Sequence, residues 1–376
     1  VVAHLHPSRI EVEGDSHADD VWYMKEALAR LDGTGDDEPV TIRAGEGGTT
    51  LRFLLAVAAT RPAVTQILAA PGVLDRPHAL LVEALEEGGA KITPLDDERG
   101  RGFEVVGWDE MPASFTVAAD RSSQYASALA LLAATGKEFE LELSTPMVSR
   151  PYFEMTLAML RSAGVDVDRD GATVSFRAGA SFDDARRLVA APDASSAAVW
   201  RVADFLGLDV SVDGAAEASL QPDAMVDEVL DALGDAPGVA PVELDLGASP
   251  DLVPVVAVAA SQMPASVEIT GVAHLRHKES NRIEQLAEAF GAVGIDLEAT
   301  DDGLVIPTGK QRPAAGARFP SFGDHRLAMA GLLLAAVDGP LVLDDPWVVA
   351  KSYPDLWHDA RSVGYMITTG GSSSHI

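Results

Sequence analysis

Polar and charged residues, with one glycine, stand at the first positions of successive helical patterns. On helical patterns that are apolar nearly all round, these positions hold Gly48, Ser122, Ser123, Gln124, Asp251, Asp324 and Arg326. On amphipathic patterns they hold Arg76, Ser149, Tyr152, Lys278, Glu279 and Arg282, with Lys351 just ahead of the last pattern. Helix N-termini expose unpaired N–H groups with partial positive charge, so they bind phosphate and carboxylate, and arginine adds bidentate contacts. If one cleft collects these helix ends, the sequence predicts a site for small polyanions.

Each of these motifs has an ordinary explanation when it is taken alone. The Ser122–Ser123 pair could be only a helix N-cap. Arg76 and Arg326 could each form a surface salt bridge, and residues 277–282 could be a solvated first turn. The Asp-His-Arg stretch before the apolar run Leu327–Ala336 is less ordinary, because its charges would border a buried region and need partners there. The recurrence of all these motifs in one repeated frame favours the functional interpretation.

The helical patterns recur in pairs at a regular interval. Each pair joins an apolar pattern to an amphipathic one. Most of the amphipathic patterns end in Gly before a short β-like run. The amphipathic patterns follow their apolar partners by 27 to 30 residues; the apolar ones begin near Gly48, Ser122, Ser195, Pro250 and Asp324, and the amphipathic ones near Pro77, Pro151, Pro222, Ser280 and Pro354. Runs such as Phe115–Val117 and Leu341–Leu343 predict strands. Because helices without a polar face belong in the interior, we expect the apolar helices to be buried.

A further amphipathic pattern begins near Asp20. Its apolar partner would begin about 29 residues earlier, before Val1, if the interval holds. We therefore expect six units with the first one truncated; the alternative is that the first unit is degenerate. Six units favour two domains of three units each, 1–185 and 186–376.

Composition narrows the class of protein. The 376 residues contain 58 acidic and 28 basic side chains, for a net charge of −30, which disfavours a nucleic-acid partner. There is no cysteine, and we find neither an apolar run long enough to cross a membrane nor a secretion signal. A carboxylate-rich surface with few lysines suits a host that accumulates salt, whereas the alternative is an acidic protein from an ordinary host.

Ten short motifs carry a resemblance to a known family. In chain order they are SHADDVWYMKEAL, GEGGTTLRF, LDRPHALLVEAL, RSSQYASALALL, VSRPYFEMTLAML, PDASSAA, SPDLVPV, LRHKESNRIEQL, GDHRLAMA and AKSYPDLW. With these motifs the chain resembles the enolpyruvyl transferases, and within them the 5-enolpyruvylshikimate-3-phosphate synthases. The resemblance implies an α/β fold, a two-domain inside-out α/β barrel of six repeated βαβαββ-type units with three units per domain, and a substrate cleft between the domains.

The resemblance also implies a reaction and its residues. The enolpyruvyl group of phosphoenolpyruvate would pass to the 5-hydroxyl of shikimate 3-phosphate through a tetrahedral adduct, releasing phosphate, on the route to chorismate and aromatic amino acids. Shikimate 3-phosphate would be bound by Ser122, Ser123, Gln124, Ser149, Tyr152, Asp251 and Lys278, and phosphoenolpyruvate by Gly48, Arg76, Gln124, Arg282, Arg326 and Lys351. Asp251 is the candidate base, and Glu279 and Lys351 are candidate proton carriers. No metal or organic cofactor is implied, and we expect a cytoplasmic monomer without nucleic-acid or membrane partners.

Departures from the family keep alternatives open. The family's initial Gly-Ser-Lys-Ser loop and following Asn-Arg have no counterpart here, so we expect a fragment or an inactive version. Glu46 occupies a usually neutral position, and His274 stands where the family often has a small polar contact to the substrate phosphate. One alternative is the sister transferase acting on UDP-N-acetylglucosamine, which commonly uses a cysteine acid. The other is a non-catalytic anion-binding relative that lost the lysine loop.

Overall fold

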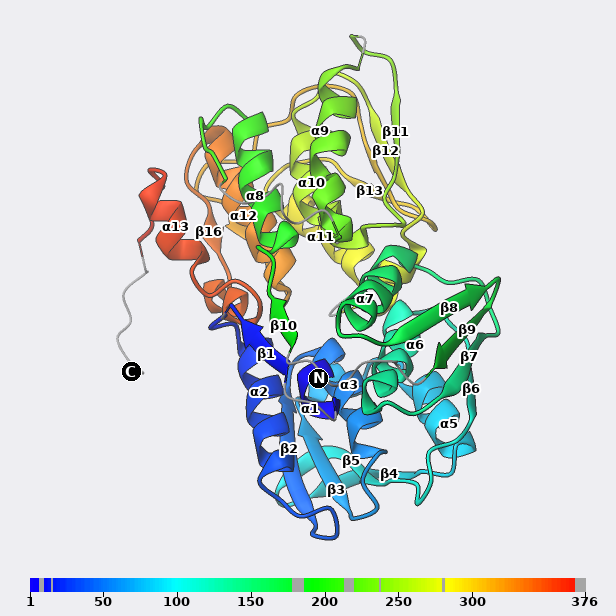
Figure 1. Ribbon diagram of the computed structural model, residues 1–376. Coiled ribbons are helices and arrows are strands. Elements are labelled where there is room, and N and C mark those ends of the chain that lie inside the picture. Colours follow the sequence, from blue (N-terminus) through cyan, green and yellow to red (C-terminus); the bar gives the residue numbers. More distant parts are fainter. Residues whose placement is uncertain are drawn as a thin grey trace.

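Two lobes, each with its own hydrophobic core, make up the protein (Figure 1). The structure is a computed structural model and describes residues 1–6, 10–14, 16–177, 186–212, 220–236, 238–278 and 281–368. Buried residues from Val2 to Phe176 form the core of the N-terminal lobe, and buried residues from Ala198 to Ala360 form that of the C-terminal lobe. The predicted boundary between 185 and 186 adjoins residues outside the described part, so it stays a prediction.

The N-terminal lobe alternates helices and strands. Its elements are α1 (Val2–Leu5), β1 (Ile10–Glu13), α2 (Asp19–Asp32), β2 (Val40–Gly45), α3 (Gly48–Ala58), β3 (Thr65–Ala69), α4 (Pro71–Leu74), α5 (Ala79–Glu87), β4 (Lys91–Asp97), β5 (Gly100–Val106), β6 (Ser114–Val117), α6 (Ser123–Ala130), the 3₁₀ helix η1 (Leu131–Thr135), β7 (Phe139–Leu143), α7 (Arg150–Ser162), β8 (Asp166–Asp170) and β9 (Thr173–Arg177).

The C-terminal lobe follows the same alternation. Its elements are β10 (Arg186–Val189), α8 (Ala194–Phe205), η3 (Pro222–Met225), α9 (Val226–Gly234), β11 (Val242–Asp245), η4 (Pro250–Leu252), α10 (Val253–Ser261), β12 (Val267–Thr270), η5 (Ala273–His277), α11 (Arg282–Ala292), β13 (Glu298–Ala299), β14 (Leu304–Ile306), β15 (Arg318–Phe319), α12 (His325–Asp338), β16 (Val342–Leu343), η6 (Pro346–Lys351) and α13 (Leu356–Ser362).

Three four-stranded sheets repeat one topology. Their strand orders are β2-β3-β5-β4, β6-β7-β9-β8 and β11-β12-β14-β13. In each sheet the first two strands are parallel and the remaining pairs are antiparallel. A parallel pair needs a crossover, and α3, α6 and α10 supply it. Each sheet with its two helices therefore forms one βαβαββ unit of the kind that the repeated patterns predict.

The helices that lack a polar face lie inside the lobes. Every residue of α10 is buried, and so are the residues of α6 from Ser123 to Ala130 except Gln124. Strand β7 instead alternates buried and exposed positions, as a strand with one face in water does. Because burial of apolar area is the main driving force for folding, the all-apolar helices occupy the interior and the sheets lie outside them.

Strands β1 and β10 run side by side where the lobes meet (Figure 1). They pair in parallel from Ile10 opposite Arg186 to Glu13 opposite Val189. Among the described residues, no helix is both long and apolar enough to cross a membrane.

Two predicted α-helical starts are different in the structure. The patterns beginning at Pro222 and Pro250 open with 3₁₀ turns, and the α-helices begin only at Val226 and Val253. Such turns are frequent at helix N-termini, where the backbone has not yet formed α-helical hydrogen bonds. The predicted strands at 115–117 and 341–343 appear as β6 and β16, the latter shorter than predicted.

Candidate active site

A cavity of about 250 Å³ is lined by residues of both lobes. The N-terminal lobe contributes residues of α3, α6, η1 and α7 and of the segments before α5, α6 and α7, and the C-terminal lobe contributes Asp251, residues of η5 and Lys278. The lining contains all seven residues that the sequence suggested for shikimate 3-phosphate: Ser122, Ser123, Gln124, Ser149, Tyr152, Asp251 and Lys278. Segments that are far apart in the sequence thus bring hydroxyl, amide, carboxylate and ammonium groups to one space.

The N-terminus of α6 supplies the first of these groups. The Ser122 hydroxyl caps the helix by accepting a hydrogen bond from the Gln124 backbone N–H at 3.2 Å. Ser123 is buried at the same helix end. The body of α6 is mostly apolar and buried, and its polar N-terminal end faces the cavity together with Tyr125 and Ser127. The exposed N–H groups there favour an anionic ligand.

The start of α7 meets the C-terminal lobe. Ser149 lies just before the helix in the left-handed backbone region, with φ of 51°. Its hydroxyl is 3.0 Å from Nε2 of His274, a residue of η5 in the opposite lobe. Burial, reinforced by the Lys278 ammonium, lowers the pKa of His274 to about 4. The imidazole is therefore neutral at pH 7, and it joins the two lobes at the edge of the cavity.

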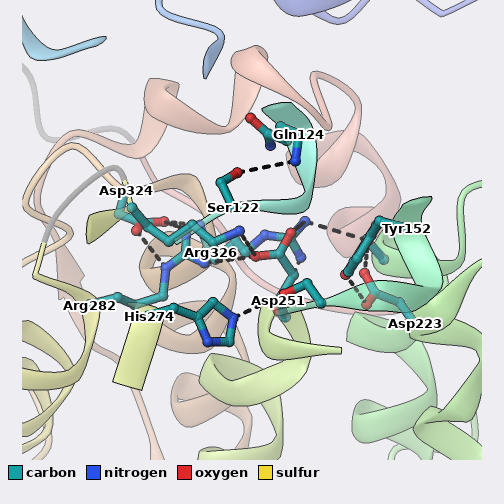
Figure 2. A network of polar contacts seen from close by, with 12 residues as sticks. Ser122, Gln124, Tyr152, Asp223, Asp251, His274, Arg282, Asp324 and Arg326 are labelled. Atoms are coloured by element: carbon teal, nitrogen blue, oxygen red, sulfur yellow. Dashed lines mark hydrogen bonds and ion pairs between the residues drawn. The ribbon is translucent and has the colours of Figure 1, made fainter. Parts of the chain in front are cut away.

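Asp251 lies at the centre of a cluster of cations (Figure 2). One carboxylate oxygen is 2.9 Å from Nη1 of Arg282 and 3.7 Å from Nζ of Lys278. The other oxygen is 3.0 Å from Nη2 of Arg326. Three cations thus converge on one carboxylate, an arrangement that suits an anionic ligand.

Asp324 holds Arg282 and the helix start that carries Arg326 in place. It is fully buried, and one of its oxygens accepts a hydrogen bond from the Arg326 backbone N–H at 2.9 Å, which caps α12. Its other oxygen accepts one from Nε of Arg282 at 2.9 Å. Arg282 is only 1% exposed, so its charge is compensated by carboxylates rather than by water. Asp324 and Arg326, the charged residues of the predicted Asp-His-Arg stretch, thus have the partners that their burial requires.

A second contact between the lobes runs through Asp223, a buried residue of η3. The Tyr152 hydroxyl donates to Oδ1 of Asp223 at 2.7 Å (Figure 2). The Ser195 hydroxyl donates to the other carboxylate oxygen of Asp223. Burial raises the pKa of Tyr152 well above its usual value and also raises the pKa of Asp223. The tyrosine therefore stays protonated and can act as a donor at neutral pH.

Gly48 begins α3 beneath two guanidinium groups. A Cβ atom added there would lie 2.8 Å from Nη1 of Arg76 and 3.5 Å from Nη1 of Arg52. Glycine therefore lets Arg76 approach the helix N-terminus closely, and a larger residue would make the guanidinium shift. The helix end and both guanidinium groups direct positive charge to the same point.

The residues suggested for phosphoenolpyruvate surround the cavity more than they line it. Among the described residues, only Gln124 of this group is part of the lining. Arg282 and Arg326 connect to the lining through Asp251. Lys351 is buried at the end of η6, which packs against α12. Glu279 lies outside the described residues, and the Glu46 side chain is exposed.

Sequence reasoning missed several residues of this region. Arg52, Arg121, Tyr125 and His277 line the cavity, and Ser195 and Asp223 connect to it through Tyr152. Most of them lie next to predicted residues or one helical turn away, so the repeated helical patterns already indicated the part of the chain in which they lie. The patterns gave no reason to select these particular residues, because their contacts depend on how the two lobes meet.

The arrangement suits two phosphorylated small molecules. Hydroxyl and amide donors come from the N-terminal lobe, and cations compensated by buried carboxylates come mainly from the C-terminal lobe. Cationic side chains are therefore gathered at one place in a chain with a net charge of −30. Within the described part of the chain, no group of three or more histidine, aspartate or glutamate side chains is placed to hold a metal ion.

Comparisons with known proteins agree on one family. A family model described as EPSP synthase (3-phosphoshikimate 1-carboxyvinyltransferase) matches residues 8–359. The 3-phosphoshikimate 1-carboxyvinyltransferase of Methanocorpusculum labreanum is 32% identical over 342 residues, which cover 86% of this chain and 78% of that protein. The protein of the same name from Syntrophobacter fumaroxidans is 33% identical over 336 residues, covering 85% of this chain and 78% of its own.

Solved structures of similar fold point the same way. An EPSP synthase from Acinetobacter baumannii superposes with a TM-score of 0.72 at 20% identity, covering 98% of this chain and 95% of that chain. The enolpyruvyl transferase NikO from Streptomyces tendae gives a TM-score of 0.66 at 19% identity, with 96% and 91% covered. At these identities the likeness concerns the fold, and it confirms the predicted two-domain α/β class.

Proposed function

This chain belongs to the EPSP synthase (3-phosphoshikimate 1-carboxyvinyltransferase) family, and we propose that it carries out its reaction in the cavity between the two lobes. The protein is an enolpyruvyl transferase of the shikimate pathway. It transfers the enolpyruvyl group of phosphoenolpyruvate to the 5-hydroxyl of shikimate 3-phosphate and releases phosphate. Its substrates are these two small molecules. The alternative hypothesis, a transferase acting on UDP-N-acetylglucosamine, is not favoured.

Shikimate 3-phosphate is proposed to occupy the cavity itself. Its phosphate would accept hydrogen bonds at the N-termini of α6 and α7, from Ser122, Ser123 and Ser149. Lys278 would add a charge to the same ligand, and Asp251 would accept a hydrogen bond from the 5-hydroxyl. Gln124 and Tyr152 complete the proposed set, which is supported by the shared cavity.

Phosphoenolpyruvate is proposed to bind beside it, against the cations. The candidates are Gly48, Arg76, Gln124, Arg282, Arg326 and Lys351. A phosphate and a carboxylate on one small molecule need several cations, and the Asp251 cluster keeps two arginines preorganised for them. When the ligand arrives, the arginines can exchange part of their contact with Asp251 for the ligand's oxygens.

The proposed chemistry follows from these positions. The 5-hydroxyl oxygen adds to C2 of phosphoenolpyruvate, Asp251 accepts its proton, and C3 gains a proton to become a methyl group. In the tetrahedral adduct C3 then loses a proton, the C2–C3 double bond reforms and the C2–O bond to phosphate breaks. Lys351 is the described candidate for the proton transfers at C3 or at the leaving phosphate, and Glu279 is the other candidate.

One observation carries this assignment: hydroxyl and amide donors of one lobe and Asp251 and Lys278 of the other line a single cavity, and Arg326 lies against Asp251. The test is a phosphate-release assay of the full-length protein with both substrates, followed by mass spectrometry of the organic product. We expect phosphate and enolpyruvylshikimate phosphate in equal amounts, and neither when one substrate is omitted. Phosphate release without addition to shikimate 3-phosphate would contradict the proposal.

A monomeric state and a cytoplasmic location are proposals of the same kind. The cavity takes its lining from two lobes of one chain, so a second copy is not needed to complete it. Light scattering at several protein concentrations tests this, and a mass of twice 39.4 kDa would contradict it.

A further inference from the structure

Arg52 on α3 connects the two proposed substrate sites. Its Nη1 donates a hydrogen bond to Oε1 of Gln124, and its Nη2 donates to the Pro77 carbonyl at 3.0 Å. The side chain is 5% exposed, and its guanidinium lies 5.1 Å from the centre of the Tyr125 ring. It therefore reaches α6 on one side and the segment after α4 on the other, from a fixed position.

The contact with Gln124 decides which end of the amide faces the cavity. A guanidinium group has five N–H donors and no acceptor, so only the amide oxygen of Gln124 can face Arg52. The amino group of the same amide is then held at the opposite side. Because Gln124 lines the cavity, that amino group can donate hydrogen bonds to ligand oxygens there. Without Arg52 the amide could turn over and present an acceptor to anionic ligands.

The contact with Pro77 holds the segment that carries Arg76. The Pro77 carbonyl accepts hydrogen bonds both from Arg52 and, at 2.7 Å, from the Tyr125 hydroxyl. Arg76 directly precedes Pro77, and its Nη1 lies over Gly48. One buried side chain thus fixes the amide of Gln124 and the backbone next to Arg76.

We propose that Arg52 is a positioning residue that fixes the Gln124 amide with its amino group toward both substrates. The inference rests on the proposed function, because it assigns Gln124 to the contact between the two ligands. It acts through Gln124 and does not require Arg52 to touch either substrate. Two consequences distinguish it from a purely structural role.

The first consequence concerns a pair of variants and their combination. Arg52→Met and Gln124→Ala should each raise the KM of both substrates about 10- to 100-fold, the range for lost hydrogen bonds to charged groups. The double variant should lose no more than Arg52→Met alone, because the contribution of the Gln124 amide is already lost when Arg52 is removed. Independent, multiplicative losses in this double-mutant cycle of kcat/KM would overturn the proposal.

The second consequence concerns the end of the amide that acts. Gln124→Glu keeps an oxygen for Arg52 but replaces the amino donors with an acceptor, so it should impair both KM values at least as much as Gln124→Ala. KM values close to those of the unaltered protein in Gln124→Glu would show that the donors are not used, and would overturn the proposal. Arg52→Lys retains the charge and one donor, so it should fall between Arg52→Met and the unaltered protein.

A control and a binding measurement complete the design. Arg101→Met removes a half-exposed arginine of β5 that pairs with Asp96 at 3.6 Å, outside the cavity lining, and should leave both KM values unchanged. Calorimetric titration with shikimate 3-phosphate and thermal melting show whether Arg52→Met is folded and how far its affinity falls. No product from the unaltered protein would refute the proposed function, whereas normal product from both it and Arg52→Met would refute only the role of Arg52.

Discussion

Asp251 has a different environment from that of a simple exposed base. Arg282, Arg326 and Lys278 surround it, so its negative charge also keeps three cations in place before the ligands bind. The carboxylate can serve two purposes in succession, as counter-ion in the empty site and as acceptor for the 5-hydroxyl proton once substrate oxygens reach the arginines. The two purposes make opposite predictions for binding and for turnover.

Replacing Asp251 by asparagine should separate these purposes. Asp251→Asn removes the proton acceptor, so we expect kcat to fall by about 10²-fold or more, the range for loss of a general base. The KM for phosphoenolpyruvate should rise little or even fall, because the cations lose their internal counter-ion. Steady-state kinetics with both substrates varied measures this. Equal losses in kcat and in affinity would mean that Asp251 only binds, and Asp338→Asn on the far end of α12 is the matched control.

A buried histidine next to the arginines makes stability depend on pH. His78 is 5% exposed, its Nε2 lies 2.7 Å from the Val73 carbonyl, and burial lowers its pKa from 6.5 to about 4. The unfolded chain therefore takes up a proton near pH 6.5 that the folded chain refuses until about pH 4. The free energy of unfolding should fall as the pH drops through this window, and this contribution should then level off.

The test is urea unfolding at several pH values between 7 and 4. His78→Gln retains a donor for Val73 and should flatten the decline, and His274, with a similarly lowered pKa, contributes the same kind of slope. His358→Gln, at an exposed position of α13, is the control and should leave the slope as it is. An unchanged slope in His78→Gln would contradict the assignment.

At the scale of elements, the apolar helices decide the architecture. The sequence alone indicated their helical period and their lack of a polar face. It also indicated the regular interval between each apolar helix and the amphipathic helix that follows it. Ile283, Leu286 and Phe290 of α11 stand at helical spacing in the sequence, and all three side chains are buried. The 3₁₀ turns at Pro222 and Pro250 could not be predicted, because the pattern does not distinguish the first turn from the rest of a helix.

Two helical glycines offer a test of how tightly the inner helices are packed. A Cβ atom at Gly331 of α12 would lie 2.7 Å from Leu343 and 2.8 Å from Phe319, whereas one at Gly291 of α11 would meet nothing within 4 Å. Both sites gain helix propensity on substitution by alanine, about 1 kcal/mol, but only Gly331→Ala adds overpacking, typically about 1–3 kcal/mol. Chemical denaturation should rank Gly291→Ala as the more stable by about that amount. Equal stabilities of the two variants would indicate that the packing around Gly331 can accommodate a methyl group.

At the scale of the whole molecule, the site depends on contacts that no local pattern contains. The seven cavity residues suggested for shikimate 3-phosphate could be predicted because each stands at a helix start that resembles a family motif. Asp223 and Arg52 could not, since their importance lies in bonds to Tyr152 and Gln124 across other elements. The sequence thus predicts which helix ends carry function, and the meeting of the lobes determines which neighbours support them.

The charge of the molecule gives a last prediction. A net charge of −30 repels itself, and strand β8 is an example, with Asp166, Asp168 and Asp170 all exposed. Because the Debye length falls from about 10 Å at 0.1 M salt to about 3 Å at 1 M, KCl should raise the melting temperature over this range. Salt screens the buried cations of the site less than exposed ones. Over the same range of KCl, both KM values should therefore rise by a smaller factor than they would at a site built from exposed cations.

A triple variant makes the origin of this effect testable. Replacing the three β8 aspartates by asparagine removes three like charges from one edge strand, so the protein should melt at a higher temperature in 0.1 M KCl and should gain less from added salt. Thermal melts of both proteins from 0.1 to 2 M KCl provide the comparison. A melting temperature independent of KCl in the unaltered protein would show that self-repulsion is not a significant part of its stability, and would remove the argument for a salt-accumulating host.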